Sequence, residues 1–232
     1  MLRQTLAALL LALLVMPLQA QERLRPSRGA GLWVGFGVKG RAPKSFENIL
    51  GENAYKRLRL AGETGYRTAD ELASGPRVFF DASASYKVNK FLDVGLEQRI
   101  AFRADSPNRH RTGIKVMLGH SVDRFELKYR FSYQHNYREW GEVREVLRNR
   151  FEVGYNIPKF KYDPTFSVEF FTWAGYRGWN YIGTRYQLGT EREFRDGHTI
   201  GAAVIHDRER SVAYPRYRTI LSLDYSINLS KL

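Results

Sequence analysis

The sequence contains no cysteine. Disulfide bonds and cysteine-ligated metal sites are therefore excluded, although exported proteins often depend on disulfides for their stability. After residue 20 the chain also lacks an apolar run long enough to form a membrane-spanning helix. A chain with these two absences can cross a membrane only as a closed barrel of strands, because a bilayer offers no other way to pair the backbone polar groups.

The first twenty residues hold the longest apolar segment, MLRQTLAALLLALLVMPLQA. Arg3 precedes the apolar run and the small residue Ala20 ends it, which is typical of a secretory signal peptide. The segment is short for a membrane span and polar sequence follows it at once, so an uncleaved anchor is the weaker alternative. We predict a signal peptide at 1–20 and a single outer-membrane barrel domain at 21–232.

The chain is strongly basic, with a formal net charge of +13 that becomes +12 once Arg3 is removed with the predicted signal peptide. The basic residues are spread over the whole chain and alternate with acids, and no basic helix or groove motif occurs, so nucleic acid is not a predicted partner. Anionic outer-membrane lipids, including lipopolysaccharide, are better partners for Arg109, Arg111, Arg208 and Arg210 in predicted loops and strand ends. The oligomeric state is left open.

Apolar and polar residues alternate along almost the entire chain after residue 31, and this period of two predicts strands rather than helices. The stretch SASYKVNKFLDVGLEQRIAFR shows the pattern, with Leu96, Ile100 and Phe102 on one face and Glu97 and Arg99 on the other. The predicted strands are 31–39, 57–66, 77–88, 92–104, 111–120, 124–135, 146–157, 165–174, 181–189, 199–206 and 217–229. The predicted fold class is all-β, an antiparallel transmembrane β-barrel.

The number of strands does not follow directly from these eleven segments. Tight connections at 88–91 and 121–124 alternate with longer polar ones, as in outer-membrane barrels with short periplasmic turns and long outer loops. If the tight turns and the C-terminus are periplasmic, the first and last predicted strands run in the same direction. Because an even count is expected, we predict twelve strands, with one more hidden at 44–53, and ten as the alternative.

Alternation alone does not say which face lies outside. A soluble lipocalin-like barrel would turn the apolar face inward around a lipophilic ligand, but it has about eight strands. Aromatic residues gather near the strand ends on the apolar face, as in the interfacial girdles of membrane barrels. These residues are Tyr66, Tyr86, Phe102, Tyr133, Tyr155 and Tyr225. We predict that the apolar face contacts lipid, with a soluble periplasmic barrel as the less favoured alternative.

This choice places the charged face in the lumen. Acids and bases are mixed on neighbouring strands, and such charges tolerate burial only if they are paired or hydrated. A lumen filled in this way is narrow or plugged rather than a wide pore. The predicted lumen charge network consists of Glu97, Arg99, Arg103, Glu126, Lys128, Arg130, Arg148, Arg150, Glu152, Glu169 and Arg185.

Three segments carry a resemblance to a known family: LWVGFGVKG, ASYKVNKFLDVGLEQRIAFR and FELKYRFSYQH. With the Arg-rich strand LRNRFEVGYN, they resemble the predicted outer-membrane barrels termed domain of unknown function 2490. The resemblance spans about 32–229, and the long insertion between the first two strands departs from it. It implies an outer-membrane location and no established activity.

Enzymatic chemistry has little support in the sequence, and the catalytic residues stay unknown. The five histidines show no metal-binding spacing, so no metal is predicted, and no cofactor either. His110 and His135 lie near predicted outer strand ends, with Ser106 and Ser132 nearby in sequence, and a serine–histidine lipid hydrolase is therefore the alternative function. We favour a non-enzymatic barrel that is structural or a narrow conduit for small solutes.

Overall fold

The computed structural model describes residues 26–68, 77–103, 107–137, 144–175, 178–212 and 214–232. The predicted signal peptide at 1–20 lies outside these residues. The described chain is dominated by strands. They are β1 (Ser27–Arg41), β2 (Leu58–Arg67), β3 (Arg77–Lys87), β4 (Leu92–Arg103), β5 (Arg109–Val122), β6 (Phe125–Asn136), β7 (Glu145–Tyr155), β8 (Asp163–Gly175), β9 (Gly178–Arg195), β10 (His198–Glu209) and β11 (Arg216–Asn228).

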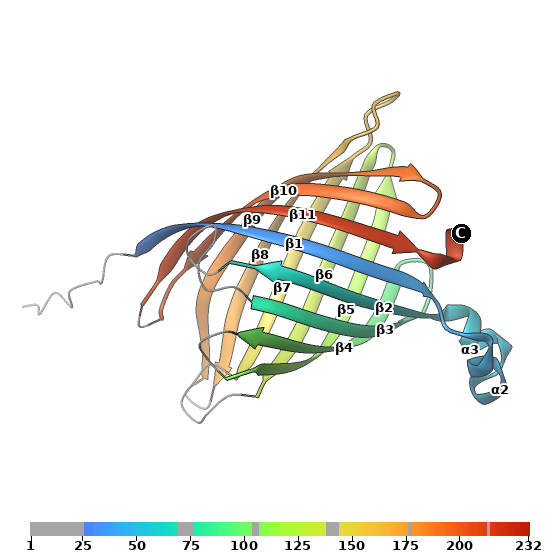
Figure 1. The fold of residues 1–232 in the computed structure, drawn as a ribbon, viewed down its shortest axis with the longest axis horizontal. Coiled ribbons are helices and arrows are strands. Elements are labelled where there is room, and N and C mark those ends of the chain that lie inside the picture. The colour runs from blue at the N-terminus through green and yellow to red at the C-terminus, as the bar shows by residue number, and fades with distance from the viewer. Residues whose placement is uncertain (1–25, 69–76, 104–106, 138–143, 176–177, 213) are drawn as a thin grey trace, which may run out of the picture.

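The strands form one closed barrel in which each strand pairs with its neighbours in sequence (Figure 1). All sequential pairs are antiparallel. The barrel closes between β1 and β11, which pair in parallel from Ser27 opposite Arg216 to Lys39 opposite Asn228. Closure leaves no free sheet edge among the described strands, so every strand finds backbone partners on both sides.

Our predicted strand count is corrected by this closure. The described residues form eleven strands, neither twelve nor ten, and the barrel is mixed rather than wholly antiparallel. The expected hidden strand at 44–53 is instead a short helical segment made of η1 (Lys44–Phe46), α2 (Glu47–Leu50) and α3 (Glu52–Arg57). The even count assumed that both ends of the chain lie on one side, and the parallel seam removes that requirement.

The two ends of the barrel differ in their connections. One end, the turn end, carries α2, α3, the C-terminal η2 (Leu229–Lys231) and the connections at 88–91, 123–124, 156–162 and 196–197 (Figure 1). At the other end, the loop end, β1 begins, and β2 is joined to β3, β4 to β5, β6 to β7, β8 to β9 and β10 to β11. On α3, a hydrogen bond from Lys56 holds the pKa of the Glu52 carboxyl below its usual value.

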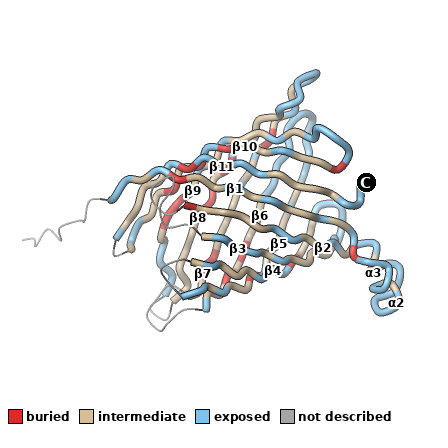
Figure 2. The backbone as a smooth tube through the Cα atoms, in the orientation of Figure 1, coloured by how far each residue is buried: buried red, intermediate tan, exposed pale blue. Residues whose placement is uncertain are grey.

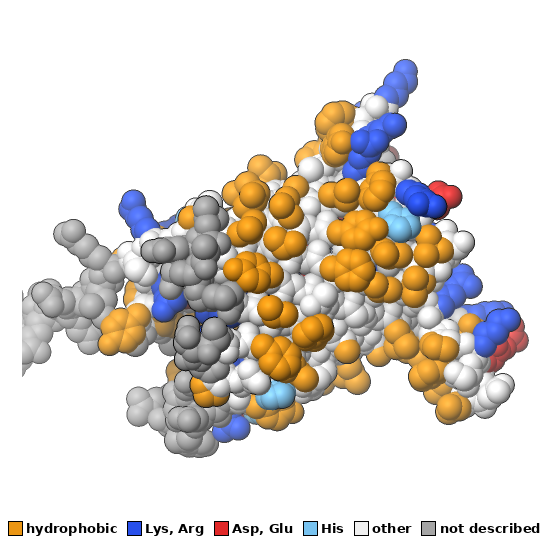
Figure 3. Space-filling model, viewed as in Figure 1, with side chains coloured by type: hydrophobic (Ala, Val, Ile, Leu, Met, Phe, Trp, Pro, Cys, Tyr) orange, Lys and Arg blue, Asp and Glu red, His pale blue; other side chains and the backbone are white. Residues whose placement is uncertain are grey.

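The outward face of the barrel is apolar. Leu96 is 59%, Leu127 42% and Leu223 43% exposed. Figure 2 shows that buried residues are few, and Figure 3 shows apolar side chains spread over the strands on the face in view. Ten of the eleven strands contribute large exposed apolar side chains, including Phe36, Phe80, Leu96, Ile114, Leu127, Phe151, Phe166, Leu188, Val204 and Leu221.

All eleven predicted segments overlap with observed strands, but several bounds differ. The largest difference is in β9, which runs from Gly178 to Arg195 and not only over 181–189. β10 continues to Glu209 and thereby includes Asp207, which we had assigned to a loop. Strands in a barrel extend beyond their apolar stretch because pairing with both neighbours continues past it.

Among the described residues, no helix is both long enough and apolar enough to span a membrane.

Candidate functional site

The interior of the barrel contains a cavity of about 880 Å³ that opens among charged side chains. Its lining comes from strands all around the barrel and is mainly polar. The apolar residues in it include Trp33 and Phe171. Because outward and inward side chains alternate, the polar residues on each strand meet here while their apolar neighbours face away.

A chain of side-chain contacts runs around the inside of the barrel, with one member from each of β3 to β11. We call it the polar belt. Its members, in strand order, are Asp81, Glu97, Arg111, Gln134, Arg148, Glu169, Arg185, Asp207 and Arg218. Acids and bases alternate along most of this order, so neighbouring strands attract each other across the lumen wall.

The first part of the belt is centred on two acids. Asp81 binds Arg99, whose Nε donates over 2.8 Å to Oδ2, and Arg111 lies 3.8 Å from the same carboxylate. Glu97 accepts hydrogen bonds from Arg111 over 3.1 Å and from the Gln134 amide over 2.8 Å. These side chains are largely buried, and each acid is matched by guanidinium groups as burial requires.

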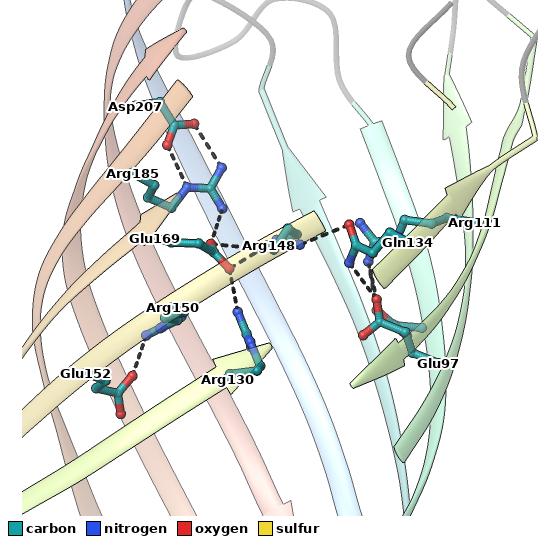
Figure 4. Close-up of polar contacts among 11 residues, drawn as sticks. Glu97, Arg111, Arg130, Gln134, Arg148, Arg150, Glu152, Glu169, Arg185 and Asp207 are labelled. Atoms are coloured by element: carbon teal, nitrogen blue, oxygen red, sulfur yellow. Dashed lines mark hydrogen bonds and ion pairs between the residues drawn. The ribbon is translucent and has the colours of Figure 1, made fainter. Parts of the chain in front are cut away.

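The second part of the belt is centred on Glu169, whose side chain is only 2% exposed (Figure 4). Arg148 donates two hydrogen bonds to it, of 3.0 and 2.8 Å, and Arg130 donates one of 2.9 Å. Arg185 lies 3.9 Å away. One buried carboxylate therefore binds or faces three guanidinium groups from three other strands.

Three contacts complete the belt, and Figure 4 shows the first two. The Gln134 side-chain oxygen accepts a 3.3 Å hydrogen bond from Arg148, which links the two carboxylate centres. On the other side, Arg185 makes a two-pronged pair with Asp207, with distances of 2.6 and 2.9 Å. Arg218 reaches Asp207 over 3.3 Å and so brings β11 into the network. The polar belt therefore spans nine consecutive strands.

β1 and β2 close the circle with aromatic stacking instead of ion pairs. The guanidinium carbon of Arg67 lies 4.2 Å from the ring centre of Trp33 and 4.4 Å from that of Phe79. Arg99 shares the Phe79 ring at 4.2 Å, and Arg185 shares the Trp33 ring at 4.8 Å. We call the series Arg99–Phe79–Arg67–Trp33–Arg185 the stacked arc. Each contact is a cation–π interaction.

Glycines make room for two large side chains of this layer. Gly65 pairs with Phe79, and a Cβ on Gly65 would lie 2.6 Å from the Phe79 ring. Gly113 pairs with Glu97, and a Cβ there would lie 2.8 Å from the Glu97 side chain. A bulkier residue at either position would displace a member of the layer.

A separate charge cluster lies towards the turn end. Lys128 binds Glu126 over 3.0 Å and Glu152 over 3.6 Å, and Arg150 binds Glu152 over 2.6 Å. Lys128, Arg150 and Glu152 line a smaller cavity of about 350 Å³ with Arg130. Glu126 and Lys128 are about half exposed, so their pair contributes little to stability.

The residues of the predicted lumen network fall into three places. Those that line the main cavity are Glu97, Arg99, Arg103, Arg130, Arg148, Arg150 and Arg185. Glu169 is buried among the arginines of the polar belt, and Glu126, Lys128 and Glu152 belong to the turn-end cluster.

Several members of this layer were missing from the prediction. Asp81, Arg111 and Gln134 lie on the charged face of predicted strands and could have been included. Asp207 was missed because the predicted strand ends at 206, whereas Arg218 lies on the polar face of the predicted strand 217–229 and could have been included. The interior aromatics Trp33, Phe79 and Phe171 have the parity of the inward face, but they were missed because the predicted network included only charged residues.

The alternative hydrolase finds no serine–histidine pair among the described residues. Ser132 is 4% exposed and lines the cavity, whereas His135 belongs to the opposite, outward-facing set of β6. His135 instead contacts Glu145 over 3.1 Å. Ser106 lies outside the described residues. A nucleophile and a base on opposite faces of a strand cannot exchange a proton.

Within the described part of the chain, no cluster of histidine and carboxylate residues suits a metal ion. No family model matches the chain, and neither a curated protein nor a solved structure matches it. The resemblance to the domain of unknown function 2490 therefore stays a prediction.

Proposed function

We propose that this protein is an integral β-barrel of the bacterial outer membrane that serves as a structural barrel or as a narrow conduit for small solutes. The observation that carries the proposal is the distribution of side chains across the barrel wall. Large apolar side chains are exposed around nearly the whole circumference, while ion-paired residues fill the interior. An exposed apolar surface of this extent is unfavourable in water and favourable in a bilayer.

Contacts on the outer face also suit a lipid environment. The Tyr129 hydroxyl donates a 2.7 Å hydrogen bond to Asn149, so this outward-facing amide has a partner within the barrel wall. Aromatic pairs lie near the turn end, where the rings of Phe125 and Tyr155 are 4.9 Å apart. Paired polar groups in the apolar band and aromatic residues at its border are features of membrane barrels.

The soluble alternative agrees less well with the lumen. A barrel that carries a lipophilic ligand needs an apolar cavity, but this cavity is lined mainly by arginines and other polar side chains. The paired side chains of the polar belt occupy the lumen at the level of Glu169, which favours a restricted path for small hydrated solutes over a wide pore.

A charge on the outer face tests membrane integration. Leu188 is 61% exposed near the middle of β9. In a bilayer, Leu188→Arg should lower the stability of the barrel by about 2–4 kcal/mol, because a charge would face lipid. In a soluble barrel the same change at an exposed site should stay within about 0.5 kcal/mol. Urea unfolding in lipid vesicles and the yield in outer-membrane fractions measure the effect.

Leu188→Ala is the matched control, because it shortens the side chain without adding charge. A stable Leu188→Arg protein recovered from the soluble periplasm would contradict the proposal. Single-channel conductance in planar bilayers then separates a conduit from a purely structural barrel.

A further inference from the structure

The main cavity carries a large excess of positive charge. Its described lining contains thirteen arginine and lysine residues and five acids. Arg77, Arg109 and Arg216 also interact with other residues, and Glu169 and Asp207 bind further arginines. Leaving out these three bases and counting these two acids still leaves an excess of three positive charges. Like charges at this density repel one another, and an anion in the cavity would relieve the repulsion.

Arg67 is the focus of this excess. Among the described residues, no carboxylate oxygen lies within ion-pair distance of its guanidinium group, which stacks on Trp33 and Phe79. The charges of Arg99, Arg185 and Arg111 all act repulsively on it. Glu63 provides attraction from a greater distance. The aromatic rings thus hold Arg67 in place without neutralising it.

Nearby arginines have donors to spare. The Nε groups of Arg111 and Arg218 are closed to the cavity and make no hydrogen bond with a described residue, so a solute would meet the terminal nitrogens of these side chains. Arg111 contacts Glu97 and Asp81 only through Nη2. A guanidinium group offers five donors in a planar fork, so a group bound through one nitrogen keeps capacity for a second oxygen ligand.

We propose that the cavity binds a small solute that carries a phosphate group, held at Arg67 with Arg99, Arg111 and Arg185 around it. Several converging guanidinium forks suit a tetrahedral oxyanion with two charges better than a planar carboxylate with one. The cavity, at about 880 Å³, has room for a phosphate and a polar organic remainder. This inference rests on the proposed conduit function and names its solute class.

The test uses the full barrel purified in a nonionic detergent, with binding measured by titration calorimetry. Inorganic phosphate is the probe, at constant ionic strength against sodium chloride. We expect a dissociation constant of about 1 mM or lower, and at least a tenfold weaker binding for Arg67→Gln. Arg124→Gln is the matched control, because it removes the same charge from an exposed turn far from the cavity.

If Arg67→Gln does not fold, Arg67→Lys replaces it. Lysine keeps the charge but lacks the fork, so phosphate binding should be several-fold weaker while the barrel stays intact. No heat signal for wild-type protein at 10-fold higher phosphate than the expected constant would overturn the proposal. So would equal phosphate affinity of the folded Arg67 variant and wild type.

Two competitors identify the source of the phosphate group. Displacement of phosphate by glycerol 3-phosphate indicates a soluble phosphomonoester, and displacement only by phosphatidic acid in the micelle indicates a lipid headgroup. Either result supports phosphate recognition at Arg67. The binding assay needs no bilayer, so loss of phosphate binding and loss of membrane integration or conductance are separate outcomes.

Discussion

The polar belt, on β3 to β11, and the stacked arc, centred on β1 and β2, accommodate arginine side chains in different ways. Both hold arginines inside a barrel. In the first, carboxylates such as Glu169 and Asp207 neutralise the guanidinium groups directly. In the second, the rings of Trp33 and Phe79 hold Arg67 by stacking, and its charge remains available. The first arrangement suits stability, and the second suits an anionic ligand.

The largest expected effect comes from a change at the central carboxylate of the polar belt. Glu169→Gln should lower the free energy of unfolding by about 3–5 kcal/mol, because three guanidinium groups would lose their buried counter-charge. Urea unfolding in detergent or vesicles measures it. Glu126→Gln, at a side chain that is 54% exposed, is the control and should change stability by less than about 1 kcal/mol. An unchanged free energy of unfolding for Glu169→Gln would show that the arginines are hydrated rather than paired.

A smaller effect is expected in the stacked arc. Gly65→Ala should cost about 1–3 kcal/mol, because the new Cβ would lie 2.6 Å from the Phe79 ring and 2.7 Å from the Val34 carbonyl oxygen. Gly119→Ala is the matched control, since nothing lies within 4 Å of its added Cβ. Thermal unfolding of both variants gives the comparison. Equal stability of the two would mean that Phe79 moves freely and that the arc is not a rigid stack.

The smallest effect concerns the junction within the belt. Gln134→Leu removes one hydrogen bond each from Glu97 and Arg148, and both keep other partners, so we expect a loss of about 1 kcal/mol. Gln187→Leu, which lies on the same cavity outside the belt, is the control. Urea midpoints of the two proteins measure the difference. A loss as large as that of Glu169→Gln would show that the belt acts as one cooperative unit.

The sequence predicted the strands because they follow from local alternation, and it predicted the outward face from that alternation together with the number of strands and the positions of the aromatic residues. Leu96 and Arg99 lie an odd number of residues apart on one strand, so their side chains point to opposite sides of the barrel wall. The number of strands and the parallel seam were predicted wrongly, because the pairing of β1 with β11 joins distant segments and no local pattern encodes it. Because we expected an even number of strands, we predicted twelve although the sequence shows eleven strand segments.

The site was predictable only in part for a related reason. Alternation places Glu169 and Arg148 on the inner face, but it does not give the register that brings them together. Phe79 sits between Val78 and Phe80, where three apolar residues in a row hide the inward position. Phe171 lies two residues after Glu169 on the same strand and therefore points to the same side. Following every second residue from Glu169 would have identified Phe171 as an interior aromatic residue.

The odd number of strands gives the molecule a built-in sidedness. Ser27 and Asn228 lie at opposite mouths of the barrel because their strands run in the same direction. In a sealed vesicle, an impermeant label added from outside would reach a cysteine introduced at one of these positions and leave the other untouched. An even-stranded barrel would present both to the same compartment, so this pair of single-cysteine proteins reports the orientation of every inserted molecule.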